Sequence, residues 1–468
     1  MCAIAKRNSG KGGNMPQEEN KMGVMPVKKL IVNMSLPMMI SMLVQALYGI
    51  VDAAYVGHYS ADAFAGLTYA YPMQNLMLSV AAGTGVGINA VLSKALGEKE
   101  FERSNRAGNN GITLGIISAI VFMLLSITGA KAFISSQTSN AVIAEQGTTY
   151  LRIVMMLSLG LFMQVTFERL LISTGKTFYT MITQSLGAII NIIMDPIMIF
   201  GYFGCPEMGV AGAAYATIIG QSIAAALALY FNLSKNTEIH FSLKGMIPDG
   251  RTVRTIYIVG IPSILMMAIG TVMTYLMDLI LSMRFSDDAV SVFGAYFKLQ
   301  SFFFMPVFGL NNGVIPVLAY NWGARKGARI KEALSFAVKV AIVIMCIGTL
   351  VFELIPGTLL KVFGAGGNVV TLGIPALRII AIHFPIAAVG ISLGSVFQAF
   401  GKSIYSLIVS TMRQLVALIP IAYLMSLTGN LDMVWLSFPL AELVSVTVTL
   451  IFYRKVKREI INPITENN

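Results

Sequence analysis

Residues 83–97 have the sequence GTGVGINAVLSKALG, and residues 309–323 have the sequence GLNNGVIPVLAYNWG. The first, fifth and last positions of both stretches are glycine, and the stretches lie 226 residues apart. Two further matches have the same separation: Leu151-Arg152-Ile153 with Leu377-Arg378-Ile379, and Gly175-Lys176 with Gly401-Lys402. A long internal repeat in one register indicates a duplicated unit. The sequence therefore predicts two copies, residues 30–233 and 255–454.

The composition indicates that both copies lie in a membrane. Hydrophobic residues make up 56% of the chain and charged residues 12%, whereas about 25% of the residues of soluble domains are charged. The mean hydropathy is +0.74. Twelve stretches are long and apolar enough to cross a hydrocarbon core of about 30 Å: residues 30–56, 67–93, 109–129, 147–171, 178–202, 209–232, 255–283, 291–320, 334–355, 373–399, 404–426 and 434–453. They are continuously apolar and not alternating, which predicts helices instead of a β-barrel.

The expected fold is an all-α polytopic membrane protein with twelve transmembrane helices in two six-helix lobes. The net charge of +11 is unevenly distributed: 25 of the 33 Lys and Arg residues lie in segments expected on one side, and three in the opposite loops. Such an excess marks the cytoplasmic side. We therefore expect a multi-pass protein of the cell (plasma) membrane with both termini cytoplasmic. The basic charge is explained by topology and does not indicate nucleic-acid binding. An even number of helices per copy gives both lobes one orientation, related by a pseudo-twofold axis.

The predicted organisation has five parts. Residues 1–29 form a polar, disordered cytoplasmic tail without the apolar stretch of a cleavable signal. The N-lobe spans residues 30–234, a cytoplasmic linker residues 235–254, and the C-lobe residues 255–458. Residues 459–468 form a second cytoplasmic tail. The three cysteines and three histidines are scattered without a ligand spacing, so a transition-metal cofactor has no support in the sequence.

Ionisable residues inside the predicted helices are the candidates for a functional site, because a charge at membrane depth is costly. Asp52 and Asp195 are both expected roughly 25 to 33 Å from the cytoplasmic ends of their helices. Asn191 lies one turn before Asp195, and Thr217 reaches a similar depth on the sixth helix. These groups offer only oxygen ligands, which suits a hard cation or a shared proton. The alternative is that the two carboxyl groups only tie helices together by hydrogen bonds.

The repeat provides an internal control for this site. Asp52 has a counterpart in Asp278. The other three residues have apolar counterparts in the second copy: Ala417 for Asn191, Ile421 for Asp195 and Leu443 for Thr217. A purely structural device would more easily survive in both copies, so the asymmetry favours a coupling-ion site confined to the N-lobe. Asp278 either faces a substrate or bonds to a neighbouring helix.

Four stretches together resemble a known family: VDAAYVGH at residues 51–58, GTGVGINA at 83–90, LLISTGK at 170–176 and NIIMDP at 191–196. In this order and spacing they resemble the multidrug and toxic compound extrusion (MATE) family, over residues 26–458. The similarity is greatest to its bacterial branch with an N-lobe cation site. The resemblance implies an antiporter that exports organic, often cationic, compounds in exchange for H+ or Na+, with two six-helix lobes around a V-shaped cleft.

By position, the resemblance assigns cation-coupling roles to Asp52, Asn191 and Asp195, which would also be the Na+ ligands, and less securely to Thr217. It also places a bending proline at Pro37. A proline removes one helix hydrogen bond, so a hinge is physically reasonable, and a fixed kink is the alternative.

Five further residues are candidates for the substrate or the cleft: Gln164, Glu168, Met273, Met277 and Asp278. Flexible methionines suit a surface that adapts to many shapes, although ordinary helix packing also explains them. Glu168 is next to Arg169, which favours an interfacial ion pair. Three deeper charged residues are interpreted as ties between the lobes: Lys298, Arg413 and Glu442.

The absence of a Walker motif points to secondary transport driven by an ion gradient. We therefore predict a monomeric multidrug efflux antiporter without a cofactor, which binds small organic substrates within the lipid bilayer. The alternative is an exporter or flippase of an endogenous metabolite or lipid-linked precursor, whose cleft would be more cationic. An intramembrane enzyme would use Asp52 and Asp195 as an acid–base pair, but no enzyme motif supports it. A channel is disfavoured by a duplication with one asymmetric ion site.

Overall fold

The computed structural model describes residues 20–362 and 366–466, and most of these are helical. The N-lobe contains α2 (Val27–Tyr59), α3 (Ala61–Gly97), α4 (Phe101–Ser135), α5 (Ala141–Met156), α6 (Leu159–Ser173), α7 (Thr177–Phe200) and α8 (Val210–Lys235). The C-lobe contains α9 (Gly250–Arg284), α10 (Asp287–Gly323), α11 (Gly327–Leu354), α13 (Asn368–Ala381), α14 (Phe384–Ala399), α15 (Ser403–Thr411), η2 (Met412–Leu418), α16 (Ile419–Ser426) and α18 (Ser437–Val456). The shorter elements are α1 (Lys21–Val24), η1 (Tyr202–Gly204), α12 (Pro356–Val362), α17 (Leu431–Trp435), η3 (Lys457–Ile461) and α19 (Asn462–Glu466).

The predicted all-α class with twelve membrane-spanning segments is confirmed. Within the described ranges, ten helices are long and apolar enough to cross a membrane, and two bent pairs bring the number to twelve. The bends are 48° between α5 and α6 and 49° between α13 and α14. They fall at equivalent places in the two copies. Pro385 lies in the first turn of α14, where its missing N–H costs nothing.

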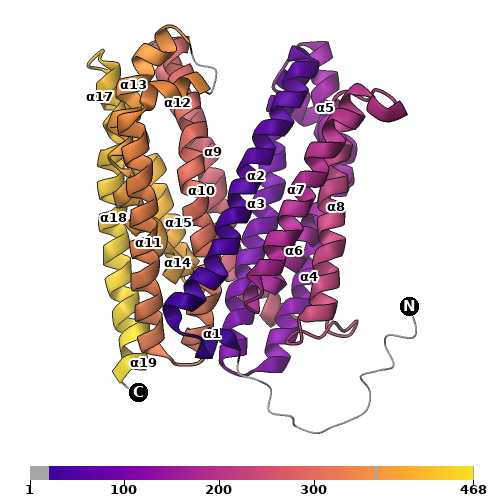
Figure 1. The fold of residues 1–468 in the computed structure, drawn as a ribbon, viewed down its shortest axis with the longest axis vertical. Helices are drawn as coiled ribbons and strands as arrows, with labels where there is room; N and C mark the ends of the chain where they lie inside the picture. Colours follow the sequence, from indigo (N-terminus) through magenta and orange to yellow (C-terminus); the bar gives the residue numbers. More distant parts are fainter. Residues whose placement is uncertain (1–19, 363–365, 467–468) are drawn as a thin grey trace.

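The two lobes meet at one end of the molecule and diverge at the other. In Figure 1 the N-lobe runs from indigo to magenta and the C-lobe from salmon to yellow. The lobes come together at the end that holds α1 and α19, which we call the α1 side, and the opposite end is the far side. One hydrophobic cluster joins the C-lobe to the α1-side half of the N-lobe. A second cluster belongs to the far half of the N-lobe alone.

The repeated glycines make the contact between the lobes. On α10, a Cβ added to Gly309 would lie 2.6 Å from Cα of Met39 on α2. On α3, a Cβ added to the equivalent Gly83 would collide with Ile264 on α9. Because only hydrogen fits at these positions, the first helix of each lobe packs directly on the second helix of the other lobe.

Both ends of the helical structure extend beyond the predicted boundaries. Residues 20–29 were expected in the tail, but Lys21–Val24 form α1 and α2 begins at Val27. The rest of that expected tail lies outside the described residues. At the other end, α18 continues through η3 and α19 to Glu466.

Candidate cation site

The two predicted carboxylates lie in the far half of the N-lobe, on helices that pack side by side. Asp52 is on α2 and Asp195 on α7, seven and five residues before the ends of these helices. Asp195 is completely buried, and Asp52 is partly exposed. Their carboxyl groups are close enough to share a hydrogen bond. One oxygen of each, Oδ1, is buried without a hydrogen-bond partner in the described part of the chain.

Asn191 and Thr217 complete the predicted group of four. The Asn191 amide is best satisfied when its Nδ2 donates to Asp195 Oδ2 at 3.2 Å. In that orientation its Oδ1 accepts from the backbone N–H of Thr217 at 3.1 Å and from the Thr217 hydroxyl at 3.3 Å. All four residues therefore come together. Asn191 and Thr217 satisfy each other and hold Asp195, which leaves the carboxylate oxygens as the open positions of the site.

A small-residue face of α7 sets this geometry. The polar and small residues Thr183, Gly187, Asn191 and Asp195 recur every four positions and lie on the buried face of the helix. At Gly220 on α8, a Cβ would lie 2.6 Å from the carbonyl oxygen of Gly187 and 3.3 Å from Cβ of Asn191. The two backbones therefore touch, and this close approach brings Asn191 within reach of Thr217.

The sequence did not indicate two further members of this group, Tyr150 on α5 and Gln74 on α3. Tyr150 is 1% exposed, and its hydroxyl lies next to the side chains of Gln74 and Thr217. A buried tyrosine hydroxyl generally has a partner, so a tyrosine within a predicted apolar helix is a signal. Its partner could not be deduced, because Gln74 comes from another helix.

Glu168 does not form the expected interfacial ion pair. It is 3% exposed, and its Oε1 accepts from Gln164 Nε2 at 3.1 Å and from Thr183 Oγ1 at 3.0 Å. Its Oε2 accepts from Gln184 Nε2 at 2.7 Å. Arg169 points elsewhere, to Asn312 Oδ1 on α10 at 3.0 Å. Gln164 and Glu168 thus belong to a buried network between α6 and α7.

The methionine candidates are also packed away. Met273 is 7% exposed and Met277 is fully buried, and both belong to the hydrophobic cluster that joins the C-lobe to the α1-side half of the N-lobe. In this conformation they are packing residues and do not line a cleft. Asp278, on the same helix, is partly buried.

The proposed ties between the lobes are corrected as well. Lys298 is exposed. Arg413 on η2 lies 3.5 Å from the 3%-exposed Glu442 on α18, so this ion pair joins two elements of the C-lobe. The sequence suggested that these internal charges have partners in the other lobe. The structure shows that Arg413 and Glu442 are each other's partners, because η2 packs against α18.

The two halves of the chain also match a known family. A model described as MatE covers residues 37–197 and 262–424. These matched segments fall one in each lobe, on the two copies of the repeat. The chain belongs to the MatE family. It is therefore a membrane transporter and not an enzyme.

Curated relatives of this MatE chain carry the name "Multidrug export protein MepA". The protein from Staphylococcus haemolyticus (strain JCSC1435) is 24% identical over 418 residues, covering 89% of this chain and 91% of the relative. The protein from Staphylococcus aureus (strain MRSA252) is 26% identical over 440 residues, covering 92% and 94%.

Solved structures share the fold of this MatE chain. One is described as the outward-facing conformation of a multidrug resistance MATE family transporter of the MOP superfamily; its TM-score is 0.89 at 22% identity, covering 96% of this chain and 99% of the other. A MOP superfamily transporter from Pyrococcus furiosus gives a TM-score of 0.87 at 23% identity, with coverages of 96% and 99%. These likenesses establish two six-helix lobes of the MATE type.

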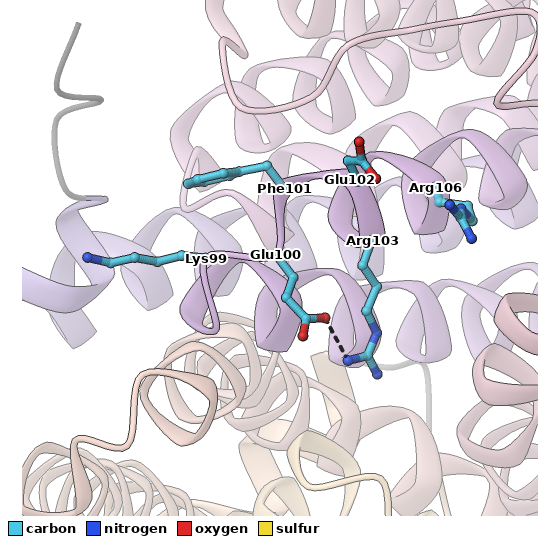
Figure 2. A pocket seen from close by; sticks show the side chains of 6 residues that line it. All are labelled: Lys99, Glu100, Phe101, Glu102, Arg103 and Arg106. Carbon is cyan, nitrogen blue, oxygen red and sulfur yellow. Dashed lines mark hydrogen bonds and ion pairs between the residues drawn. The ribbon is translucent and has the colours of Figure 1, made fainter. Parts of the chain in front are cut away.

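A surface depression on the α1 side of the MatE chain is a poor alternative site. It measures about 530 Å³ and is lined by Lys99, Glu100, Phe101, Glu102, Arg103 and Arg106. Figure 2 shows that these side chains point in different directions, with Arg103 turned to Glu100. Opposite charges that pair at an exposed surface, without convergence on a common point, are typical of a solvated helix end.

Proposed function

We propose that this MatE protein exports small organic compounds, often cationic, in exchange for a cation held between Asp52 and Asp195. The observation that carries the proposal is a buried Oδ1 atom on each of these two residues, for which the described residues supply no hydrogen-bond partner. Two carboxylates so close together, one of them fully buried, repel each other unless a cation lies between them or one is protonated. The name of the MepA relatives supports drug-like substrates.

A proton fits the site best. Asn191 and Thr217 are engaged with each other, so few oxygens beyond the two carboxyl groups are open to an ion. One proton shared between Asp52 and Asp195 removes the repulsion and needs no further ligand, and the pair then titrates as a unit. Sodium is the second candidate, because the available atoms are all oxygens.

The α1 side is assigned to the cytoplasm on the distribution of Lys and Arg. The transport cycle would then be alternating access, in which the lobes separate first on one side and then on the other. With the lobes apart on the far side, as in Figure 1, a proton enters from outside and neutralises the pair. The drug is released outward, and drug that enters from the cytoplasm favours loss of the proton.

Helix α2 is suited to connect the site with the lobe contact. Its first part packs against α10 of the C-lobe at Ser35 and Gly313, and its last part carries Asp52 in the N-lobe. Pro37 lies at the boundary between these parts. We propose that α2 bends there when the charge at Asp52 changes, since a proline leaves a gap in the helix hydrogen bonds.

The test is ethidium efflux from proteoliposomes that contain the purified protein, with proton and sodium gradients imposed separately. Wild type should respond to the proton gradient, and Asp52→Asn and Asp195→Asn should not. Asp278→Asn is the matched control, because it removes the carboxylate at the position equivalent to Asp52 and should keep most of the efflux. If efflux responds fully to the sodium gradient and not to the proton gradient, the coupling ion is sodium. Full proton-driven efflux by Asp195→Asn would overturn the proposal.

A further inference from the structure

Residues 20–25, which we call the N-terminal strap, are bound by the C-lobe on the α1 side. Arg329 Nη2 donates to the carbonyl oxygens of Met22 at 3.1 Å and of Met25 at 2.7 Å. Asn321 Nδ2 donates to the same Met22 carbonyl at 3.0 Å. Lys326 Nζ donates to the Gly23 carbonyl at 3.0 Å. The strap is therefore attached through its backbone to the end of α10 and the start of α11.

The other end of the strap is bound by the N-lobe. Asn20 Nδ2 donates to the Thr174 carbonyl at 3.1 Å and to the Glu238 carboxylate. Lys21 Nζ donates to Asn33 Oδ1 at 2.7 Å. The strap also lies tightly over the turn between α6 and α7, which passes through Gly175 at φ +86°. A Cβ at that glycine would lie 3.1 Å from Cε of Lys21.

The site that receives the strap is partly buried, and its side chains are hydrogen-bonded to each other. Arg329 Nε donates to Asn321 Oδ1 at 3.0 Å, so the two side chains form one unit with their remaining donors directed at the strap. Asn321 is 1% exposed and Met22 is fully buried. A planar guanidinium with several donors in a fixed fork suits two backbone carbonyls at once. A lysine at this position would be a less exact partner.

The segment before α9, residues 245–249, makes the equivalent contact in the opposite direction: it precedes the first helix of the C-lobe and is bound by the N-lobe. Asn110 on α4 donates through Nδ2 to the Gly245 carbonyl at 3.0 Å and accepts from the Asp249 N–H at 2.7 Å. Thr113 Oγ1 donates to the Met246 carbonyl at 2.6 Å. Each lobe therefore holds the segment that precedes the first helix of the other lobe. The strap differs because charged side chains bind it on the C-lobe.

We propose that Arg329 and Asn321 are positioning residues of the transport cycle. By holding the strap across both lobes, they keep the α1 side closed, and they must release it when that side opens. Asn20, held by the N-lobe, and Met22, held by the C-lobe, are two residues apart and so at most about 7 Å. The strap must therefore release one lobe when the lobes separate there by more than this. This inference rests on the alternating access in the proposed function.

The first test measures opening directly and needs neither drug nor coupling ion. Ser35 is 1% exposed, and its hydroxyl donates to the Leu310 carbonyl across the lobe contact at 3.0 Å. Ser35→Cys, in a background without Cys2, Cys205 and Cys346, reports opening when a membrane-impermeant maleimide is applied to inside-out vesicles. Labelling of the Ser35→Cys protein should be slow, and it should be faster in variants that also lose contacts of the strap.

Adding Arg329→Ala should raise the labelling rate about tenfold, as expected for loss of hydrogen bonds from a charged donor. Arg329→Lys should restore part of the slow rate. Lys331→Ala is the matched control, since Lys331 is exposed on the same helix. Asn20→Ala loosens the opposite end of the strap and should also raise the rate, which guards against a folding defect confined to α11. Equal labelling of Arg329→Ala, Asn20→Ala and Lys331→Ala would overturn the inference.

A kinetic readout separates positioning from a merely structural role. If the strap favours closure of the α1 side, Arg329→Ala should lower both KM and kcat for ethidium presented at that side. A purely structural loss would lower the amount of active protein and leave KM unchanged. If no variant transports ethidium under any gradient, the proposed antiport is wrong. If the labelling rate still rises in Arg329→Ala and Asn20→Ala, the role of the strap in closing the α1 side is supported independently.

Discussion

Gly97 on α3 and Gly323 on α10 occupy equivalent positions in the repeat, and each lies against the backbone of the other's helix. A Cβ at Gly97 would collide with the carbonyl oxygen of Tyr320, and a Cβ at Gly323 with that of Lys94. The helices therefore cross at backbone contact on the α1 side. The glycines that reveal the duplication in the sequence are the residues at which its two copies touch.

Gly97→Ala and Gly323→Ala should each destabilise the protein by about 1 to 3 kcal/mol, because an added methyl group overpacks this crossing. The measurement is the thermal unfolding midpoint in detergent. Gly294→Ala is the control on α10, since a Cβ there has no atom of the described residues within 4 Å. A midpoint shift no larger than that of the control would contradict the close crossing.

Thr217→Val should weaken cation coupling without abolishing it. The substitution keeps the side-chain shape and removes the hydroxyl that bonds to Asn191, so Asp195 loses part of its support. Loss of such a supporting contact typically lowers ion affinity about tenfold or more. The measurement is the proton concentration that gives half-maximal ethidium efflux. Thr447→Val, at an exposed position on α18, is the control, and equal values for both variants would refute the support role.

Glu168→Ala should lower stability by about 1 to 3 kcal/mol, because three donors from Gln164, Thr183 and Gln184 would lose their acceptor in a buried site. Glu168→Gln should be milder, as its carbonyl oxygen can still accept. Thermal unfolding in detergent compares the two. Efflux per folded molecule should survive in Glu168→Gln. Complete loss of efflux in a stable Glu168→Gln protein would show that this carboxylate takes part in transport.

The Arg413–Glu442 pair should behave as a structural unit of the C-lobe. Arg413→Met leaves the 3%-exposed Glu442 without its cation and should cost about 1 to 3 kcal/mol. This is less than for a fully buried pair, because Arg413 itself is 30% exposed. The double variant Arg413→Met/Glu442→Leu should recover most of that loss. Unfolding midpoints of the single and double variants form the measurement, and strictly additive losses would exclude coupling between the two residues.

The repeat and the apolar stretches were sufficient to predict the fold class, because length and hydropathy determine spans and a fixed register determines duplication. The same reasoning placed Asp52, Asp195 and Thr217 at similar depths and Asn191 one turn away, and the structure brings the four together. Depth follows from the rise per residue of a helix.

Contacts between distant side chains were not predictable. Burial of Glu168 depends on donors from α7, and the Arg413–Glu442 pair depends on how η2 meets α18. The bend at Leu157 has no proline to mark it. Residues 20–25 looked like part of a polar tail because their partner, Arg329, lies about 300 residues away.

The most direct test of the account is proton release on drug binding to the purified protein. Titration calorimetry with ethidium, repeated in buffers with different ionisation enthalpies, gives the number of protons released per bound drug. The account predicts release by wild type and by Asp278→Asn, and none by Asp195→Asn. If Asp195→Asn binds the drug and releases as many protons as wild type, the Asp52–Asp195 pair is not the coupling site.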